Sequence, residues 1–246
     1  MAEEIGKAKK VRSVAVVRGK TEGHERVRPI EVIWGDTNTT TIHREWGCLL
    51  KVDPSRVFFT PRLSYERMRV AKLVRDGETV LNAFAGVGAF SILISKLHPS
   101  TKILSVDSNP CAFEFMLENR RLNKCWGVVP VLSDAFDVMK SFSDRFDRVL
   151  LPLPELSLKA LPYAVRCVKN GGVIHFYGTA CRKKGLPQAS DLWNDIKEAV
   201  EGEARVDLKI LNFRKVRAVN RGIYHVVYDL VVKKQYQNQN ATSTSK

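Results

Sequence analysis

The sequence predicts an α/β protein: a Rossmann-like, mostly parallel seven-stranded sheet with an antiparallel edge hairpin, preceded by a small strand-rich N-terminal module. Three observations lead to this fold class. After residue 57, short apolar runs alternate with segments whose apolar and charged residues have helical periodicity. Before that point, β-branched residues dominate, and Gly and Asp separate them. The last two apolar runs have no helix between them, which is typical of an antiparallel pair at a sheet edge.

The N-terminal module is expected to span residues 1–57. Its strand-like runs are Val14–Val17, Ile30–Trp34 and Thr39–Ile42. The dipeptide Gly35-Asp36 lies between the second and third runs and predicts a hairpin turn between two strands. We therefore expect a small antiparallel unit ahead of the main domain.

The main domain is expected to span residues 58–234. Five parallel strands are predicted at 79–81, 103–106, 128–132, 148–151 and 172–177. Helices are predicted at 65–74, 89–97, 112–123, 156–168 and 190–200, where apolar and charged residues mix with helical periodicity. The edge hairpin is predicted at 206–213 and 224–232. Residues 235–246 are polar and predict a disordered tail.

Composition limits the class of protein. With 246 residues and 44% hydrophobic content, the chain can bury one full core and a small appended domain. Apolar stretches fall short of the roughly 20 residues that a membrane span needs, and the charged amino terminus lacks a signal-peptide core. We therefore expect a soluble, cytoplasmic protein. The five cysteines are scattered without a Cys-x-x-Cys pair, so neither a metal site nor a disulfide framework is predicted.

The net charge of +14 suggests a polyanionic partner. Lysines and arginines concentrate at 7–28, 62–75, 182–184 and 214–221. Such patches can contact phosphates with salt-sensitive affinity. Charge alone does not distinguish a nucleic-acid surface from a solvated basic face.

A glycine-bearing turn followed by an acidic residue predicts a nucleoside-cofactor site. The apolar run 80–82 leads into the turn 83–88, and about twenty residues later a second apolar run ends at Asp107. Glycines let the backbone approach a ligand closely, and an Asp in this place can accept hydrogen bonds from both ribose hydroxyls. The third glycine of a diphosphate-cradling turn is absent. The pattern therefore favours S-adenosylmethionine over a dinucleotide.

Polar residues also follow the later strands. Asn109-Pro110 opens a helix after Asp107, and Asp134 follows the strand at 128–132, where it could meet the adenine amino group. Both have a structural alternative, because Asn and Asp are also common helix caps. The residues that these motifs assign to the cofactor site are Asn82, Phe84, Gly86, Gly88, Asp107, Ser108, Asn109, Asp134 and Ala135.

Three longer motifs occur together in one known family. They are Thr41-Ile42-His43-Arg44-Glu45-x-Gly47, Val57-Phe58-Phe59-Thr60-Pro61-Arg62-Leu63-x-x-Glu66-Arg67 and Asn82-Ala83-Phe84-Ala85-Gly86-Val87-Gly88. In these motifs the chain resembles the archaeal and eukaryotic tRNA guanine-37 N1-methyltransferases and their wyosine-pathway aminocarboxypropyltransferase paralogues. The resemblance implies a class I S-adenosylmethionine-dependent methyltransferase fold, S-adenosyl-L-methionine as cofactor and tRNA as partner. It also adds Phe59 and Arg62 to the cofactor site.

The resemblance implies residues for the chemistry. Glu66 takes the place of the family's general base, which removes the proton of guanine N1. The alternative is a surface Glu66 that pairs with Arg62, Arg67 or Arg69. The family's arginine near the target base corresponds best to Arg28, with Arg26 as the other candidate. His43 and His175 are expected to be packed residues.

Three positions depart from the family pattern. Pro152 replaces an Asn that orients guanine, and proline has neither a side-chain amide nor a backbone N–H. Phe58 replaces a Tyr and lacks its hydroxyl, while Asn82 replaces an acidic residue and lacks its charge. These departures concern the target-base pocket, through Pro152 and Phe58, more than the cofactor pocket.

We predict an S-adenosylmethionine-dependent tRNA methyltransferase that forms N1-methylguanosine at position 37 of the anticodon loop, with Glu66, Arg28 and Pro152 at the target base. The aminocarboxypropyl paralogues also lack the Asn, so aminocarboxypropyl transfer to a wyosine-precursor base is an alternative. A non-catalytic RNA-binding or partner subunit is another. The chain is short for the family, which predicts that an accessory protein can replace the tRNA-elbow-binding domain. No membrane or DNA partner is expected.

Overall fold

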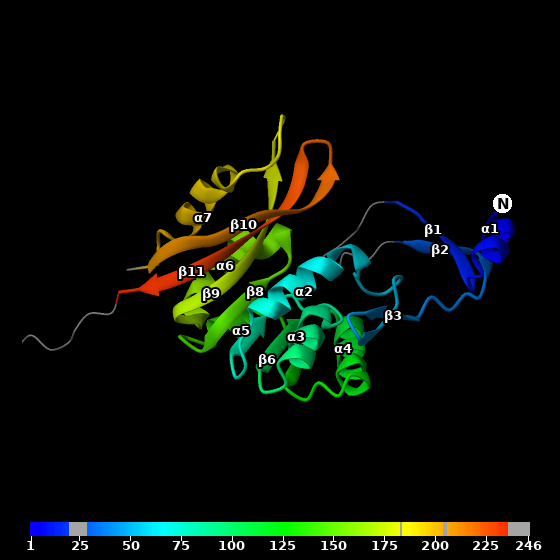
Figure 1. The fold of residues 1–246 in the computed structure, drawn as a ribbon, viewed down its shortest axis with the longest axis horizontal. Coiled ribbons are helices and arrows are strands. Elements are labelled where there is room, and N and C mark those ends of the chain that lie inside the picture. Colours follow the sequence, from blue (N-terminus) through cyan, green and yellow to red (C-terminus); the bar gives the residue numbers. More distant parts are fainter. Residues whose placement is uncertain (20–28, 183, 204–205, 236–246) are drawn as a thin grey trace, which may run out of the picture. The chain divides into compact units, whose positions relative to one another are not determined.

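The computed structural model describes residues 1–19, 29–182, 184–203 and 206–235 (Figure 1). Within it the chain forms two compact units, residues 1–138 and 139–246. Arg26, Arg28 and nearly all of the predicted polar tail lie outside the described residues. The predicted domain boundary at residue 57 stays a prediction.

The first unit begins with a helix and a strand pair. Helix α1 (Ala2–Lys9) precedes β1 (Ser13–Val17), which pairs antiparallel with β2 (Ile30–Gly35). Gly6 lets the helix approach β2, because a Cβ there would lie 2.1 Å from the ring of Trp34. Helix α1 was not predicted from the sequence, since four of its eight residues are charged and Gly6 lies at its centre.

The predicted hairpin turn at Gly35-Asp36 is wrong. Strand β2 pairs with β1 and not with β3 (Thr41–Glu45), which instead pairs with β4 (Cys48–Val52). Gly35 has a positive φ of 87°, and a Cβ there would lie 2.2 Å from the Arg12 carbonyl oxygen. The glycine therefore serves close backbone packing at the end of β2. The real turn is Trp46-Gly47, where both residues have positive φ, as a two-residue hairpin requires.

Two asparagines of α4 (Pro110–Leu122, with Asn123 as its C-cap) bind the open edge of β4. The side-chain amide of Asn119 accepts from Lys51 N (2.6 Å) and donates to Lys51 O (3.1 Å). Asn123 does the same with Leu49 N (2.8 Å) and Leu49 O (2.7 Å). The amides satisfy backbone groups that a sheet edge would leave unpaired. They fasten the β3–β4 hairpin to the Rossmann-like part of this unit.

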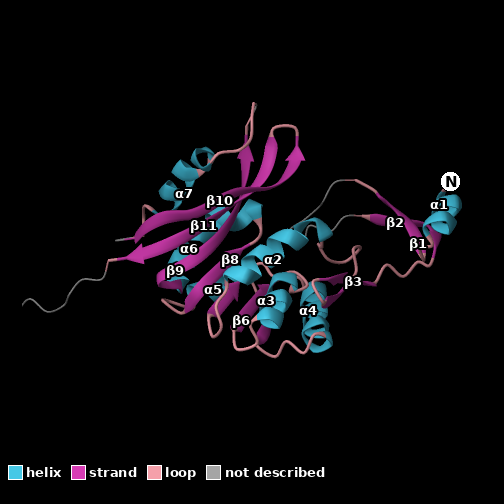
Figure 2. Ribbon diagram, viewed as in Figure 1, coloured by secondary structure: helices cyan, strands magenta, loops and turns pink. Residues whose placement is uncertain are grey.

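The rest of the first unit alternates strands and helices. In chain order they are the 3-10 turn η1 (Pro61–Leu63), α2 (Ser64–Leu73), β5 (Thr79–Asn82), α3 (Ala89–Leu97), β6 (Lys102–Asp107), α4, β7 (Val128–Leu132) and α5 (Ala135–Lys140). Strands β5, β6 and β7 are parallel, and residues such as Val80, Ile103 and Val128 are fully buried. Figure 2 shows the helices of this unit beside its strands.

Strand β7 lies at the edge of the sheet and is protected by a proline. Ile103 N donates to Gly127 O (2.9 Å), and Ser133 N donates to Asp107 O (3.1 Å). The backbone groups of odd-numbered residues between 127 and 133 therefore face β6. Those of Pro130 face the unpaired edge of the sheet, where proline offers no N–H. A proline there blocks the addition of another strand.

The second unit holds the parallel strands β8 (Phe146–Leu151) and β9 (Val168–Cys181), joined by α6 (Pro154–Cys167). The 3-10 turn η2 (Ala189–Asp191) and α7 (Trp193–Val200) follow. The predicted edge hairpin is present as β10 (Val206–Asn220) and β11 (Ile223–Lys234), with β11 antiparallel to β9. Both strands are longer than predicted.

A buried polar chain crosses the strands of the second unit. Arg148 Nη1 donates to His175 Nε2 (2.8 Å), and His175 Nδ1 bonds Asp229 Oδ1 (2.5 Å). Asn212 Nδ2 donates to Asp229 Oδ2 (3.0 Å). Because a guanidinium only donates, His175 accepts at Nε2 and carries its proton on Nδ1. His175 is fully buried, in agreement with its expected packing role.

The seven strands have the order β10-β11-β9-β8-β5-β6-β7. This confirms the predicted mostly parallel seven-stranded sheet with an antiparallel edge hairpin. No helix in the described part of the chain is long and apolar enough to cross a membrane.

Candidate cofactor and target-base site

The turn between β5 and α3 lies against the carboxyl end of β6. Ala85 N donates to Val106 O (2.8 Å), and Gly86 N donates to the Asp107 Oδ2 atom (2.7 Å). The two motifs that predicted a nucleoside site therefore meet in space. A carboxylate beside a glycine N–H at the carboxyl ends of parallel strands is where an open α/β sheet binds its ligand.

Gly86 and Gly88, the two glycines of the turn, differ in what surrounds the position of a Cβ atom. Both have positive φ, 55° at Gly86 and 80° at Gly88. A Cβ at Gly88 would lie 2.8 Å from Met116 Cγ, so this residue allows α3 and α4 to pack. A Cβ at Gly86 would meet nothing closer than Phe58 O at 3.7 Å. The space over Gly86 is therefore available to a ligand.

Asp107 is half-buried and its carboxylate is oriented by backbone donors. Oδ2 accepts from Gly86 N, and Oδ1 accepts from Asn109 N (3.0 Å). A carboxylate has about four acceptor positions and accepts hydrogen bonds from hydroxyl groups as well as from backbone N–H groups. The arrangement suits the two hydroxyls of a ribose.

Asn109 and Ser108 are placed differently from Asp107. Asn109 Oδ1 accepts from Cys111 N (2.8 Å) and Nδ2 donates to Arg56 O (3.2 Å), so the side chain caps α4 and holds the preceding loop. This agrees with the helix-cap alternative. Ser108 is exposed beside Asp107.

Asn82, at the end of β5, leaves a buried polar atom without a partner. Its Nδ2 donates to Ser91 Oγ (3.0 Å), and Ser105 Oγ donates to the same oxygen (2.6 Å). Asn82 is fully buried, and its Oδ1 has no hydrogen-bond partner among the described residues. An orphaned acceptor of this kind beside the turn fits a site completed by a polar ligand.

The residues after β7 contribute a cap and an aromatic contact. Asp134 Oδ1 accepts from Phe136 N (2.6 Å), so Asp134 caps α5, again as the structural alternative describes. Ala135 is buried. The ring of Phe84 lies 6.3 Å from that of Phe136 in an edge-to-face arrangement. Phe84 thus brings the glycine turn into contact with the first turn of α5.

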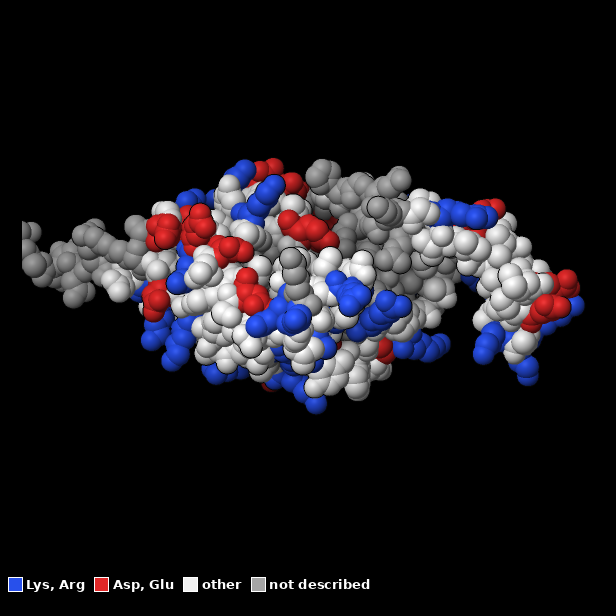
Figure 3. All heavy atoms as spheres, turned by 90° about the horizontal axis from the view of Figure 1, so that it is seen from above, with Lys and Arg blue, Asp and Glu red and all other residues white. Residues whose placement is uncertain are grey.

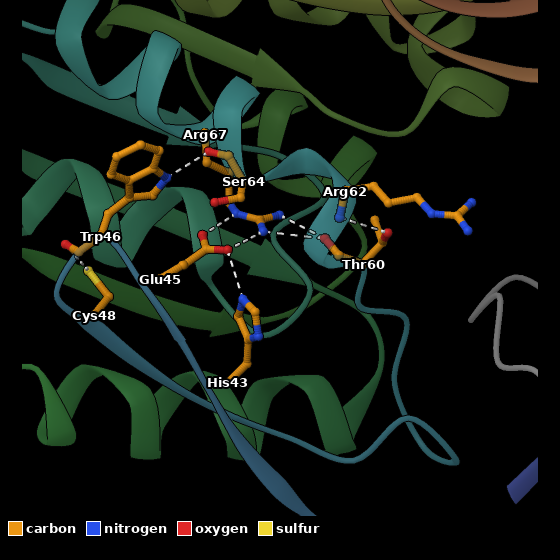
Figure 4. A network of polar contacts seen from close by, with 8 residues as sticks. All are labelled: His43, Glu45, Trp46, Cys48, Thr60, Arg62, Ser64 and Arg67. Atoms are coloured by element: carbon orange, nitrogen blue, oxygen red, sulfur yellow. Dashed lines mark hydrogen bonds and ion pairs between the residues drawn. The ribbon is translucent and has the colours of Figure 1, made fainter. Parts of the chain in front are cut away.

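A buried ion pair fixes the segment that leads to α2 (Figure 4). Arg67 Nε and Nη2 bond the two Glu45 carboxylate oxygens, each at 2.6 Å, and Arg67 also donates to Thr60 O at 3.3 Å. His43 Nε2 lies 3.1 Å from Glu45 Oε2. Burial alone would raise the pKa of Glu45, but the hydrogen bonds and charge of Arg67, with those of His43, hold it below its ordinary value. The pair joins the β3–β4 hairpin to α2.

Phe59 and Arg62 lie on either side of Thr60 in the same segment. The Phe59 ring lies 5.2 Å from that of His43 and 5.3 Å from the Arg67 guanidinium carbon. Arg62 is exposed, and Figure 4 shows its side chain pointing away from the ion pair. Within the described residues its guanidinium has no ion-pair partner.

Glu66 pairs with one of its neighbouring arginines. Arg69 Nη2 lies 2.7 Å from Glu66 Oε1, and Arg69 Nε lies 3.0 Å from Glu66 Oε2. The Glu66 side chain is 3% exposed, so it is a buried carboxylate and not the surface residue of the alternative interpretation. Arg67, by contrast, pairs with Glu45.

Pro152 lies in the second unit, in the short loop between β8 and α6. Ser157 Oγ lies 2.7 Å from the carbonyl oxygens of both Leu151 and Leu153, the residues on either side of the proline. These bonds fix the loop at the carboxyl end of β8. Arg28, the third residue predicted at the target base, lies outside the described residues.

A separate cavity of about 360 Å³ is lined by residues that include Lys96, Lys124 and Trp126. Lys96 lies in the last turn of α3, and Lys124 follows α4. Cations at helix carboxyl ends stabilise the helices themselves. We assign this cavity no ligand.

Sequence reasoning missed the Glu45–Arg67 pair, although both residues lay in motifs that it quoted. The signal was present, because two opposite charges in apolar surroundings are rarely buried unless paired. Among the described residues, no group of three or more His, Cys, Asp or Glu side chains could hold a metal ion.

Residues 41–205 match the family model described as the TRM5/TYW2 methyltransferase domain. The chain belongs to the TRM5/TYW2 methyltransferase family. The matched residues include the β3–β4 hairpin, the Pro61–Leu63 turn, the glycine turn and Pro152.

Three relatives have related printed activities. The chain is 42% identical over 236 residues to the tRNA (guanine(37)-N(1))-methyltransferase Trm5b of Pyrococcus abyssi, covering 94% of this chain and 68% of that protein. It is 37% identical over 196 residues to the tRNA 4-demethylwyosine(37)-methyltransferase Taw21 of Saccharolobus solfataricus, covering 80% and 70%. It is 30% identical to a tRNA(Phe) (4-demethylwyosine(37)-C(7)) aminocarboxypropyltransferase of Methanocaldococcus jannaschii, covering 92% and 88%.

Solved structures agree with the fold. The complex of aTrm5 with tRNALeu matches with a TM-score of 0.78 at 33% identity, covering 93% of this chain and 65% of that one. Methanocaldococcus jannaschii TYW2 in complex with AdoMet matches with a TM-score of 0.76 at 30% identity, covering 84% and 91%. The predicted class I methyltransferase fold is confirmed.

Proposed function

We propose that this chain is an S-adenosylmethionine-dependent tRNA methyltransferase that forms N1-methylguanosine at position 37 of the anticodon loop. The observation that carries the proposal is the contact of Gly86 N with the Asp107 carboxylate, in a chain 42% identical to a tRNA (guanine(37)-N(1))-methyltransferase. The contact supports a nucleoside cofactor. The similarity to this relative is the reason to propose guanine 37 as the target base.

Residues of the first unit would hold S-adenosylmethionine. Asp107 would accept from the ribose hydroxyls, Gly86 would leave room for the ligand, and Asn82 would offer its unpaired buried oxygen. Phe84, Gly88, Ser108, Asp134 and Ala135 would complete the walls of this pocket, with Phe59 and Arg62 from the segment before α2. The cofactor supplies an activated methyl group on a sulfonium centre, which needs no acid catalysis.

Glu66 would act on the target base. Guanine N1 is a weak acid and must lose its proton as it gains the methyl group. Glu66 lies beside Arg69 and is almost fully buried, so bulk water has little access to it. A carboxylate within hydrogen-bond reach of N1 can take this proton. Cationic or amide donors would stabilise the charge that grows on O6, and Arg28 is the proposed donor.

A second candidate is a reaction on a wyosine-precursor base. Pro152 stands where the guanine-specific family pattern has an Asn, and the loop around it offers the base neither an amide nor an N–H from this residue. The relatives at 37% and 30% identity are named for 4-demethylwyosine at position 37, as a methyltransferase and an aminocarboxypropyltransferase. A tricyclic base without the same hydrogen-bond needs would suit Pro152.

The test uses two labels in one cofactor. The purified chain is incubated with S-adenosylmethionine labelled at the methyl carbon and at the carboxyl carbon. Two RNA substrates are compared, an unmodified transcript with G37 and a tRNA that carries 4-demethylwyosine. Products are digested to nucleosides and identified by mass spectrometry.

Each outcome selects one candidate. Methyl label in 1-methylguanosine supports the first proposal. Methyl label only in the wyosine precursor supports the second as a methyl transfer, and carboxyl label supports aminocarboxypropyl transfer. Cofactor binding without label in either RNA would contradict both and leave a non-catalytic RNA-binding role. An accessory protein that assists tRNA selection stays a prediction.

A further inference from the structure

The hairpin end of β10 and β11 carries many cations and no carboxylates. Between Leu208 and Tyr228 the chain has five Lys or Arg residues and no Asp or Glu. Among the described residues, the segment that follows β9 adds two more cations. We call the following set the basic strip: Arg182, Lys184, Arg214, Lys215, Arg217 and Arg221.

Backbone and tyrosine contacts join the two parts of the basic strip. Arg182 N donates to Gly222 O (2.7 Å), in the turn of the hairpin. Tyr224 Oη donates to Gly185 O (3.4 Å), which holds the segment after β9 against β11. Figure 3 looks onto this end of the second unit and shows Lys and Arg side chains gathered over the hairpin. The cations therefore form one surface.

A β-bulge places cations on both faces of β10. Lys215 is opposite Val226, but Arg217 is opposite His225, so one extra residue lies between them. Neighbouring residues of β11 point to opposite faces, and their partners do the same. Lys215 and Arg217 consequently point to opposite faces of the edge strand. The strip wraps around the edge instead of covering one side.

Side-chain contacts orient these cations. Arg217 Nε donates to His225 Nδ1 (3.2 Å), and Lys215 Nζ lies 5.7 Å from the centre of the Tyr224 ring. Arg182 pairs with Asp191 at 3.4 Å. Oriented guanidinium groups suit phosphate oxygens, which they can bind with two hydrogen bonds.

The strip lies at the ligand-binding edge of the sheet. His225 and Tyr224 are opposite Thr179 and Ala180, near the carboxyl end of β9. Strand β8 is parallel to β9, and the Pro152 loop follows its carboxyl end. Ligands bind open α/β sheets at this edge. The cations are therefore on the side of the second unit where the target base is proposed to enter.

A simpler reading is that the cations only protect an edge strand from pairing with other chains. That reading accounts for Lys209, which lies away from the hairpin turn. It does not account for Arg182 and Lys184, which are not on β10, or for the concentration of charge at the turn.

We infer that the basic strip binds the phosphodiester backbone of the RNA substrate next to the target base. The inference rests on the proposed function for the identity of the RNA. Each lysine or arginine that neutralises a phosphate releases counterions, so affinity falls with salt. Contacts of this kind position the RNA and carry little sequence information.

The test compares two triple variants with equal loss of charge. Lys184→Ala/Lys215→Ala/Arg221→Ala removes three exposed cations of the strip. The control, Lys159→Ala/Lys197→Ala/Lys209→Ala, removes three exposed lysines elsewhere in the second unit. Binding to a tRNA transcript without cofactor is measured at several salt concentrations, and thermal unfolding and S-adenosyl-L-homocysteine affinity confirm that both variants are folded.

The strip variant should lower the slope of log affinity against log salt by about 2 to 3, since each lost phosphate contact contributes about 0.7 to 0.9. The control should lower it by less than about 1. Arg221→Glu alone should weaken binding more than Arg221→Ala. Equal slopes for the two triple variants would overturn the inference, as would unchanged RNA binding with loss of binding to phosphatidylserine vesicles.

These outcomes are separate from those of the transferase assay. If no label reaches RNA but the slope of log affinity against log salt is lower for the strip variant than for the control, the proposed function is wrong and RNA binding by the basic strip is supported. If label is transferred normally and the slopes of the two triple variants do not differ, RNA binding by the basic strip is contradicted and the proposed function is supported.

Discussion

Substituting two glycines that both have positive φ would test whether the space over Gly86 belongs to the cofactor. Gly86→Ala puts an L-residue at φ 55°, which costs about 1 to 2 kcal/mol of folding free energy. Its Cβ would meet no atom closer than 3.7 Å, so no clash is added. Gly77→Ala is the matched control, because Gly77 has φ 80° and nothing within 4 Å of its Cβ. Both variants should therefore lose a similar free energy of unfolding.

Cofactor affinity should separate the two variants. Titration calorimetry with S-adenosyl-L-homocysteine should show at least about a tenfold loss for Gly86→Ala, equivalent to about 1.4 kcal/mol, because the methyl group occupies ligand space. Gly77→Ala should bind as the wild type does. Gly88→Ala should lose about 1 to 3 kcal/mol more free energy of unfolding than the other two variants, since its Cβ would lie 2.8 Å from Met116 Cγ. Wild-type affinity in Gly86→Ala would refute the assignment of this space to the cofactor.

Three further substitutions test the rest of the site. Asp107→Ala should weaken S-adenosyl-L-homocysteine binding by about 1.5 to 3 kcal/mol, as for lost hydrogen bonds to a charged group, and an unchanged dissociation constant would contradict a ribose contact. Glu66→Gln should slow single-turnover methyl transfer by a factor of about 10² to 10⁴ with cofactor affinity intact, and a wild-type rate would remove Glu66 as the base. Glu45→Gln should cost about 3 to 5 kcal/mol in urea unfolding at pH 7, because it leaves buried Arg67 without its counter-charge. The pKa of Glu45 is lowered from 4.5 in the folded chain, so its stabilisation is present above that pH and is lost as the pH falls below it. The difference between wild type and Glu45→Gln should then shrink below pH 4.5, and a constant difference would argue against the ion pair as its source.

The elements that the sequence predicts best are those with a continuous apolar pattern. Helix α3 (Ala89–Leu97) and strand β7 (Val128–Leu132) have their predicted bounds. Strand β9 extends beyond the predicted strand 172–177 at both ends, and the predicted strand began at Gly172. A Cβ at Gly172 would lie 2.9 Å from Asp147 O, so this glycine allows close packing within the strand and does not end it.

Missed elements have weak or unusual local signals. Helix α5 has six residues, too few for helical periodicity to show. Strand β4 follows the turn Trp46-Gly47, and tryptophan is not a residue that predicts positive φ. The Trp46 side chain is held there by tertiary structure, since its Nε1 donates to Ser64 O at 3.1 Å. Such a contact cannot be read from neighbours in the sequence.

The site was predictable to different degrees. The meeting of Gly86 and Asp107 follows from the topology of parallel strands, whose carboxyl ends share an edge. The partner of Glu66 was partly predictable, because residues three apart on a helix face each other and adjacent ones do not. This favours Arg69 over Arg67, as the structure has it. The pairing of Arg67 with Glu45 depends on a long-range hairpin contact, so the sequence indicates that buried charges need partners but not which partner each one takes.

The two asparagines at the end of α4 determine the register of strand β4. Four residues along a helix advance about 6 Å, and two residues along a strand advance about 6.6 Å, so Asn119 and Asn123 match Lys51 and Leu49 in spacing. A strand shifted by one residue would present its other backbone edge and lose all four amide bonds. The spacing of the two asparagines along the helix thus fixes the register of β4. Because β4 pairs with β3, it also fixes the position of Glu45 opposite Arg67. Inserting one residue between the two asparagines should misplace the ion pair without touching either of its members.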